Sequence, residues 1–293
     1  MTSCTSRGVV FATACAAIAF AQQTADQPQW QVAAGGKKAF DVVSIRPSKP
    51  GTFTPASFPL DAGDAYRSTG GRFEADFGLS TYIKFAYKLS LTTDQIDSMV
   101  APLPKWVATD RFHIQARAQG NPSKDQMRLM VQSMLADRFK LAVHFENREV
   151  PLLALTLVKP GKMGPKLRPH SAGPPCNVGD VFPPACDVYQ LEETPSGSRL
   201  AGSRNTTMEL IAGALPSLVH LARPVVDKTG LSGRFDFTIE WMPEPSEPPQ
   251  PNSDPQGPTF LQALHDQLGL KLQSTKGPLR TIVIDHVERP SEN

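Results

Sequence analysis

The amino-acid sequence predicts an α+β protein made of two tandem duplicated units, each a small mixed sheet with two helices packed on it. Its composition, with 40% hydrophobic and 20% charged residues in a chain of 293, is that of a globular protein. Segments that alternate apolar and polar residues with period two are interleaved with segments of helical period. The same order of segments occurs in residues 72–158 and again in residues 199–287. The 28 Pro residues favour long ordered loops over a helical bundle.

The first 21 residues are typical of a secretory signal peptide. Arg7 precedes an apolar stretch from Gly8 to Phe20, and the segment ends at the small residue Ala21. This stretch is shorter than the roughly 20 residues that a membrane-spanning helix needs. We therefore expect an exported protein, periplasmic or extracellular, which does not span a membrane after signal cleavage. Residues 22–39 predict a disordered leader.

The two cysteines that remain after signal cleavage, Cys176 and Cys186, predict one disulfide. Export would place them in an oxidising compartment, where disulfides persist. The closed loop has eleven residues counting both ends, and the chain-entropy estimate for such a loop is roughly 2.5 to 3 kcal/mol. Metal binding is the alternative, but the sequence places no pair of histidines near these cysteines, as a zinc site would require.

Two strands and two helices form the most regular part of the repeat. Residues Arg111–Arg117 and Arg234–Glu240 both alternate apolar and polar side chains, so that one face of each strand is expected to be buried. Each strand is followed by a helix that begins with a capping box, Ser123 with Gln126 and Thr259 with Gln262. The sequence therefore predicts Phe112 and Phe235 at equivalent buried positions.

The remaining segments complete the predicted organisation. A leading strand is expected at Phe40–Ile45, and apolar helices are expected at Leu79–Leu89 and Met208–Leu221, the second broken or kinked at Pro216. Each unit is expected to close with two strands, and these segments are 140–145 and 152–158 in the first unit and 271–274 and 281–287 in the second. The predicted domains are a first unit at 40–158, a Pro-rich linker with the Cys pair at 159–198, and a second unit at 199–293.

Three segments carry a resemblance to a known family. Phe40–Ser48, Arg223–Phe235 and Val283–Asn293 resemble an exported, soil-associated acidobacterial family, classed as a domain of unknown function and sometimes attached to antirepressor-type metallopeptidases. The resemblance covers nearly all of the chain after the leader and implies no established activity. The second unit is also similar, more loosely, to the short periplasmic domains at the N-termini of secretins and TonB-dependent receptors. That similarity concerns fold rather than function.

No catalytic or cofactor motif is present in the sequence. The segment Asp227–Gly230 matches the phosphorylated-Asp motif of P-type ATPases, but Leu231 replaces the Thr that usually follows, so a turn is expected. No Gly-x-Ser-x-Gly, His-Glu-x-x-His or phosphate-binding loop occurs. The six His are scattered without i, i+4 pairs. We therefore predict no catalytic residue, no cofactor and no metal site.

The predicted function is binding rather than catalysis. The candidate binding surface is aromatic, formed by Tyr82, Tyr87 and Trp106, since aromatic rings offer large rigid contact areas. A net charge of +2 lacks the basic excess of a nucleic-acid binder, so the expected partner is a protein or an envelope component. Two alternatives stay open. One is a hydrolase of envelope or extracellular polymers, with carboxylates such as those at 110, 137 and 240 assembled in three dimensions. The other is a sensory domain acting with a membrane partner.

Overall fold

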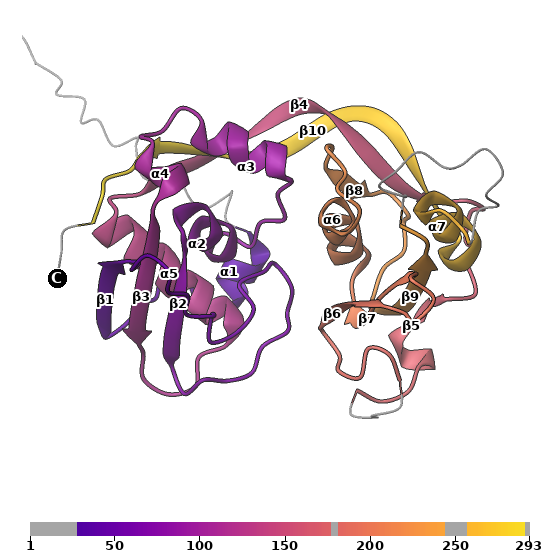
Figure 1. Cartoon of the computed structure of the whole chain (residues 1–293), viewed down its shortest axis with the longest axis horizontal. Helices are drawn as coiled ribbons and strands as arrows, with labels where there is room; N and C mark the ends of the chain where they lie inside the picture. Colours follow the sequence, from indigo (N-terminus) through magenta and orange to yellow (C-terminus); the bar gives the residue numbers. More distant parts are fainter. Residues whose placement is uncertain (1–27, 177–180, 244–256, 291–293) are drawn as a thin grey trace, which may run out of the picture.

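The structure, a computed structural model, describes residues 28–176, 181–243 and 257–290. Two lobes lie side by side, and a long two-stranded ribbon joins them (Figure 1). Helices and sheets are present in both lobes, which confirms the α+β class. The predicted signal peptide lies outside the described residues. Within the described ranges, no helix is both long and apolar enough to cross a membrane.

The first lobe packs helices against one face of an antiparallel sheet with the strand order β1–β3–β2. The capping box of α5 forms as predicted, because the Ser123 hydroxyl accepts from the Gln126 amide and the Gln126 side chain accepts from the Ser123 amide. The buried side of α5 covers the buried side of β3 at Phe112, Ile114 and Ala116. The elements of this lobe are α1 (Gln29–Ala33), β1 (Val42–Pro47), β2 (Arg72–Gly78), α2 (Leu79–Ala86), α3 (Thr93–Val100), α4 (Trp106–Thr109), β3 (Arg111–Arg117) and α5 (Lys124–Arg138).

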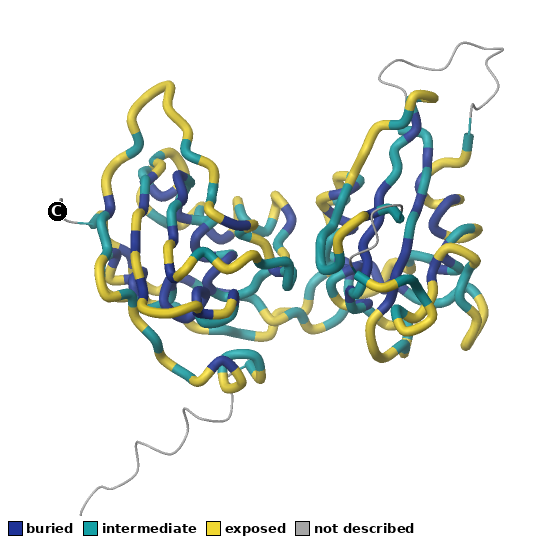
Figure 2. The backbone as a smooth tube through the Cα atoms, turned by 90° about the horizontal axis from the view of Figure 1, so that it is seen from below, coloured by how far each residue is buried: buried dark blue, intermediate teal, exposed yellow. Residues whose placement is uncertain are grey.

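The second lobe has a sheet with the strand order β5–β9–β7–β6 and its own core. Figure 2 shows buried segments inside each lobe. The predicted capping box of α7, Thr259 with Gln262, is also formed, and α7 ends at Gly269, whose φ of 68° gives a left-handed cap. The elements are β5 (Leu167–Pro169), the 3-10 turn η1 (His170–Ala172), β6 (Tyr189–Glu193), β7 (Arg199–Thr206), α6 (Met208–Leu218), β8 (Val225–Asp227), β9 (Phe235–Trp241) and α7 (Phe260–Leu268).

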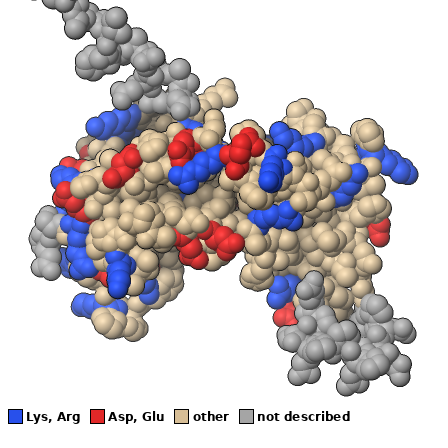
Figure 3. All heavy atoms as spheres, turned by 90° about the horizontal axis from the view of Figure 1, so that it is seen from above, with Lys and Arg blue, Asp and Glu red and all other residues tan. Residues whose placement is uncertain are grey.

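The ribbon consists of β4 (Ala142–Leu157) and β10 (Leu270–His286), which pair antiparallel along their whole length. Ile282 and Ile284 at the end of β10 lie in the core of the first lobe, whereas Leu153 and Leu155 near the end of β4 lie in that of the second. Each strand therefore leaves its own lobe and ends in the other. Seen from above, the molecule shows basic and acidic side chains interspersed along its upper face (Figure 3).

Five elements occur in the same order in the two lobes. A strand, a helix, a second strand, a second helix and a ribbon strand form the series β2, α2, β3, α5, β4 and the series β7, α6, β9, α7, β10, with α3 and α4 between α2 and β3 in the first lobe and β8 between α6 and β9 in the second. Phe112 lies opposite Pro47 and Phe235 lies opposite Pro169, and both Phe side chains are buried. The expectation of equivalent buried Phe positions agrees with this register. Origin by duplication stays a prediction.

Several boundaries differ from the sequence-based expectation. The two closing strands predicted in each unit are one continuous strand, because the ribbon crosses between lobes without a turn and Pro151 and Pro278 are accommodated within it. The predicted linker contains β5 and β6, which complete the second sheet. The predicted leader contains α1, which lies against α5. Helix α6 continues past Pro216 to Leu218. The segment at Asp227 is a turn as expected, since its carboxylate accepts from the Thr229 amide at 2.9 Å.

Candidate binding cleft between the lobes

A cleft of about 380 Å³ lies between the two lobes, a volume within the usual range for small-molecule sites. Its first wall is the loop at 60–64, Lys84 of α2 and residues 89–91. Its second wall comes from β6, β7 and α6. The lining residues are Leu60, Asp61, Ala62, Gly63, Asp64, Lys84, Leu89, Ser90, Leu91, Asp187, Tyr189, Leu191, Ser203, Asn205, Thr206, Leu210, Gly213, Ala214, Ser217 and Leu218. Six leucines among them make most of the surface apolar.

An ion-pair bridge connects the lobes beside the cleft. Arg234 of the second lobe donates to Asp64 of the first at 3.1 Å and to Asp187 of its own lobe at 3.2 Å. Lys88 also pairs with Asp64, at 3.1 Å. Partial burial acts to raise the pKa of Asp64, but the hydrogen bonds and charges of Lys88 and Arg234 outweigh it and hold the pKa below its ordinary value. Asp64 is therefore ionised, and Lys88 and Arg234 compensate its negative charge at the contact between the lobes.

Two buried cations hold the 61–64 loop in place. The Arg128 guanidinium, fully buried on α5, donates to the carbonyl oxygens of Asp61 at 2.9 Å and Gly63 at 2.8 Å, and it pairs with Asp125. Lys124 donates to the Asp61 carboxylate at 2.6 Å and to the same Gly63 carbonyl at 2.8 Å. Burial lowers the pKa of both cations, and the neighbouring carboxylates oppose this. The shape of the first wall therefore depends on α5.

Lys84 is the lining residue whose charge is left uncompensated. The three lining aspartates are all paired, with Lys124, Lys88 or Arg234. The Lys84 ammonium makes no ion pair or hydrogen bond with any residue in the described ranges, and burial lowers its pKa. Across the cleft, the Tyr189 hydroxyl is buried and makes no hydrogen bond within the described part of the chain. Burial also raises the pKa of Tyr189, so this hydroxyl stays protonated as a potential donor.

The structure separates the three aromatic residues of the predicted binding surface. Tyr82 is fully buried, and its hydroxyl, with one proton to donate, lies 2.9 and 2.7 Å from the carbonyl oxygens of Ala75 and Phe112, so it belongs to the core and not to a surface. Helical spacing did not reveal this, because a core tyrosine with satisfied hydrogen bonds has the same pattern. Trp106 packs edge-on against Phe112 with the Arg289 guanidinium over its ring.

Tyr87 lies in a second hollow between the lobes, of about 790 Å³. Its ring meets Phe145 of the ribbon edge-on at 5.9 Å, and burial raises the pKa of its hydroxyl to about 12. Trp30 of α1 also lines this hollow, with the Lys88 ammonium 5.9 Å from its ring. Of the three predicted aromatics, Tyr87 is the one that the structure places between the lobes.

The carboxylates named for a hydrolase are not brought together. Asp110 pairs with Arg289 in the first lobe at 2.8 Å, and Asp137 is exposed on α5 of that lobe. Glu240 lies on β9 of the second lobe and accepts from Ser198 at 2.6 Å. Asp64 and Asp187 do converge, on the guanidinium of Arg234, and Asp64 also pairs with Lys88. A general acid requires a raised pKa, whereas the pKa of Asp64 is lowered.

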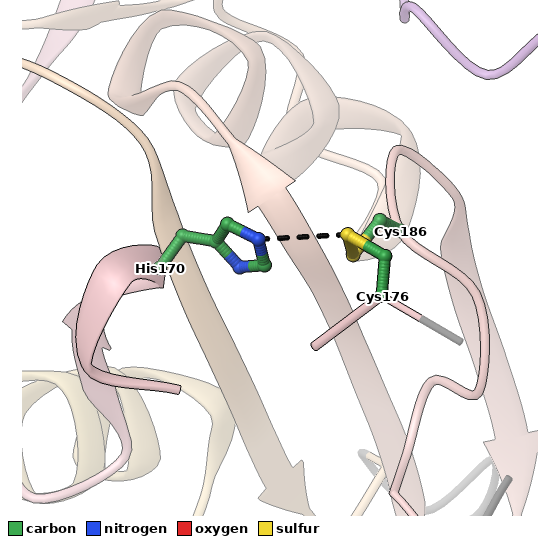
Figure 4. A group of neighbouring side chains, drawn as sticks. All are labelled: His170, Cys176 and Cys186. Carbon is green, nitrogen blue, oxygen red and sulfur yellow. Dashed lines mark hydrogen bonds between the residues drawn. A yellow bond between two sulfur atoms is a disulfide. The ribbon is translucent and has the colours of Figure 1, made fainter. Parts of the chain in front are cut away.

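The predicted cysteine pair is at disulfide distance. The Cys176 and Cys186 sulfurs are 2.17 Å apart and their Cα atoms 5.2 Å apart. His170 lies beside them, with its Nε2 atom 3.5 Å from the Cys176 sulfur (Figure 4). These three residues could hold a metal ion only with the sulfurs reduced, because thiolates are the ligands. His170 was not predicted as a site residue; its position six residues before Cys176 was the available signal.

The cleft residues were missed for a different reason. Lys84, Asp64 and Arg234 belong to no motif, and Asp64 and Arg234 are 170 residues apart. Only the occurrence of leucines beside charged residues, in Leu60–Asp64 and Lys88–Leu91, could have pointed to a polar and apolar surface.

Comparison with known protein families identifies the chain. A family model described as "Protein of unknown function (DUF3738)" matches residues 80–287, so the chain belongs to this family. The match includes the ribbon, the second lobe and the first lobe from α2 onward, and it does not include β1, β2 or the 60–64 loop. No curated protein and no solved structure matches the chain.

Proposed function

We propose that this protein, whose family has no assigned activity, is a non-enzymatic binding protein that takes up a small amphipathic anion in the cleft between its lobes. The observation that carries the proposal is the uncompensated charge of Lys84 in a cleft whose other lining charges are paired. A buried or half-buried cation without a partner is costly, and an anionic ligand group removes that cost. The six lining leucines favour an apolar body for the same ligand.

The ribbon supports access to the cleft. Residues 147–150 of β4 lie opposite 277–280 of β10 and form the span between Ile282 in the first core and Leu153 in the second, and 147–149 are exposed. A two-stranded ribbon is marginally stable by itself, so this span is the part of the connection that can bend. The ion-pair bridge at Arg234 is partly exposed, and such pairs contribute at most about 1 kcal/mol each. We therefore infer that the lobes open about the ribbon and close on the ligand, which brings it to the Tyr189 hydroxyl.

Export is part of this proposal. The sequence of residues 1–21 and the cysteine pair at disulfide distance both support an oxidising, extracytoplasmic location. A fusion of residues 1–40 to alkaline phosphatase, which is active only after export, tests the point. Activity is expected, and an inactive, cytoplasmic fusion would contradict it.

The ligand proposal is tested with the signal-free chain and a panel of amphipathic carboxylates, such as octanoate, phenylpropionate and indole acetate, each beside its neutral primary amide. We expect a carboxylate to raise the unfolding temperature while its amide does not. At a ligand concentration of a hundred times Kd, the stabilisation is about 2.7 kcal/mol. Lys84→Met should abolish the shift, and Tyr189→Phe should reduce it. Lys276→Met, at an exposed position on the ribbon, is the matched control and should leave it unchanged.

Two results would overturn the ligand proposal. One is the absence of any shift across the panel. The other is a shift that persists in Lys84→Met, since the anion would then bind elsewhere. The hydrolase alternative is favoured by no observation in the cleft, where the converging carboxylates Asp64 and Asp187 share Arg234. The sensory alternative is likewise supported by no contact of the described residues.

A further inference from the structure

A second group of reactive side chains lies away from the cleft, at the disulfide of the second lobe. His170 stands at the start of η1, directly after β5, and its ring edge points at the disulfide (Figure 4). Its Nε2 atom is 3.5 Å from the sulfur of Cys176. His170 and both cysteines are half-buried, so the group is accessible from solvent. The imidazole is therefore in contact with an atom that changes charge when the disulfide is reduced.

Asp236 fixes the orientation of that imidazole. Its carboxylate, only 4% exposed on β9, accepts from His170 Nδ1 at 2.6 Å and from the Asn205 amide at 3.0 Å. An ionised carboxylate can only accept, so Nδ1 carries a proton. Nε2, the nitrogen that faces Cys176, is then the atom that can exchange a proton with its sulfur. Gly173 leaves the necessary room, because a Cβ atom there would lie 2.2 Å from an oxygen of Asp236.

This arrangement has the order carboxylate, imidazole, sulfur. In thiol chemistry an adjacent imidazolium stabilises a thiolate, and a carboxylate on the far nitrogen holds the ring in place. A disulfide that only staples a loop needs neither group.

The loop that carries the cysteines is also held without the disulfide. Arg204, 1% exposed on β7, donates to the carbonyl oxygens of Pro174 at 2.5 Å, Pro175 at 2.6 Å and Pro183 at 3.4 Å. Pro174 and Pro175 directly precede Cys176, and Pro183 lies three residues before Cys186. Breaking the sulfur–sulfur bond therefore leaves both flanks of the loop attached to β7, and the two sulfurs stay close enough to bond again.

We propose that Cys176–Cys186 is an exchange-active disulfide whose redox partner is a dithiol, with His170 as the acid–base group and Asp236 as the residue that positions it. A thiolate of the dithiol attacks the sulfur of Cys186. The bond between the two protein sulfurs breaks, and Cys176 leaves as a thiolate that takes the Nε2 proton of the imidazolium. The second thiol of the partner, as its thiolate, then displaces Cys186, which is protonated by solvent. The protein disulfide gains two electrons, and the dithiol becomes a disulfide.

The experiment measures reduction of the signal-free chain by dithiothreitol. His170→Asn should slow the reaction about tenfold or more, since a general acid typically contributes a factor of 10² to 10⁴ in enzymes. It should also lower the equilibrium constant for reduction about tenfold, which corresponds to about 30 mV for this two-electron couple. Asp236→Asn should slow reduction less, because the amide oxygen still accepts from the ring. His144→Asn is the control, as His144 is exposed and pairs with Asp285 on the ribbon, away from the cysteines.

A second measurement needs only the wild-type chain. In the reduced wild-type chain, iodoacetamide should modify Cys176 before Cys186, as peptide mass spectrometry would show, because only the Cys176 sulfur contacts the imidazole. Equal reduction rates for wild type and a folded His170→Asn would overturn the proposal, and so would first modification at Cys186. These measurements involve no cleft ligand, so their outcome is independent of the binding function proposed above.

Discussion

Replacing Arg128 with Met is the perturbation that most directly tests how the cleft is built. Met keeps an unbranched apolar side chain of similar length on α5 but removes the guanidinium. The two carbonyl oxygens of the 61–64 loop, on Asp61 and Gly63, lose their charged donor at 2.9 and 2.8 Å, and the Asp125 carboxylate keeps only Lys88 as its ion-pair partner. The loop carries Asp64 at its end, so the change is transmitted to the contact between the lobes.

The expected loss in the free energy of unfolding follows from these contacts. A hydrogen bond to a charged group contributes roughly 1.5–3 kcal/mol, so two contribute roughly 3–6 kcal/mol. Part of this is offset, because burying the guanidinium is itself unfavourable, as the burial-lowered pKa of Arg128 indicates. The remaining Lys124 also still donates to the Gly63 carbonyl. We therefore expect Arg128→Met to destabilise the first lobe by about 3 kcal/mol.

Chemical and thermal unfolding provide the assay. A loss of about 3 kcal/mol corresponds to a fall of roughly 6–12 °C in the unfolding temperature of a domain of 150–250 residues. Amide hydrogen exchange in the 61–64 loop should accelerate as well. Arg117→Met, at an exposed position on β3, is the matched control and should change stability by less than about 0.5 kcal/mol. If Arg128→Met behaved like Arg117→Met, the loop would not depend on the guanidinium and the reasoning would fail.

Three further predictions concern the second lobe, the contact between lobes and the disulfide. Gly164→Ala should destabilise the second lobe by about 3 kcal/mol, the upper end for overpacking. The new Cβ atom would lie 2.4–2.5 Å from backbone atoms at the end of α7. In the control Gly277→Ala the new Cβ atom meets no atom closer than 3.7 Å, so chemical denaturation should show nearly unchanged stability. Because the folded-state pKa of Asp64 lies below its ordinary 3.8, its stabilising contact with Arg234 is present above that pH and is lost as the pH falls through the folded pKa. X-ray scattering should therefore show a larger radius of gyration at pH 2.5 than at pH 6, and an unchanged radius would contradict the bridge. Reduction of the disulfide should cost no more than about 3 kcal/mol and leave both lobes folded, whereas loss of the whole cooperative transition would show that it staples a core.

Local patterns in the sequence were sufficient for the helices and strands that depend on near neighbours. The capping boxes of α5 and α7 formed as predicted, because the hydroxyl and the Gln that make each box are three residues apart and need no tertiary partner. The alternation in β3 and β9 predicted which apolar side chains are buried, since one face of each sheet packs on its core. It did not predict the burial of Asp236 on the other face of β9, which depends on tertiary neighbours such as His170. The cysteine pair could also be predicted, because only two cysteines follow the predicted signal peptide and the predicted compartment is oxidising.

Tertiary structure decided the features that join distant parts of the chain. The sequence predicted two separate closing strands in each unit, yet the ribbon is continuous, because its two strands hydrogen-bond to each other across the space between the lobes. Tyr82 had the spacing of an accessible helical aromatic, but its hydroxyl is enclosed by two carbonyl groups from β2 and β3. Burial of this kind depends on what packs against the helix, which the helix's own residues do not specify.

The cleft and the disulfide site are the clearest examples of features that the tertiary structure decided. Asp64 meets Arg234 across 170 residues, and His170 meets Asp236 across 66. By itself, the sequence determined the α+β class, the main helices and the strand faces, because those follow from hydrogen bonding and burial over a few residues. Where Lys84 lies relative to the paired aspartates, and which imidazole faces the disulfide, was decided only by the packing of the two lobes and their loops, since an electrostatic contact depends on distance in space rather than along the chain.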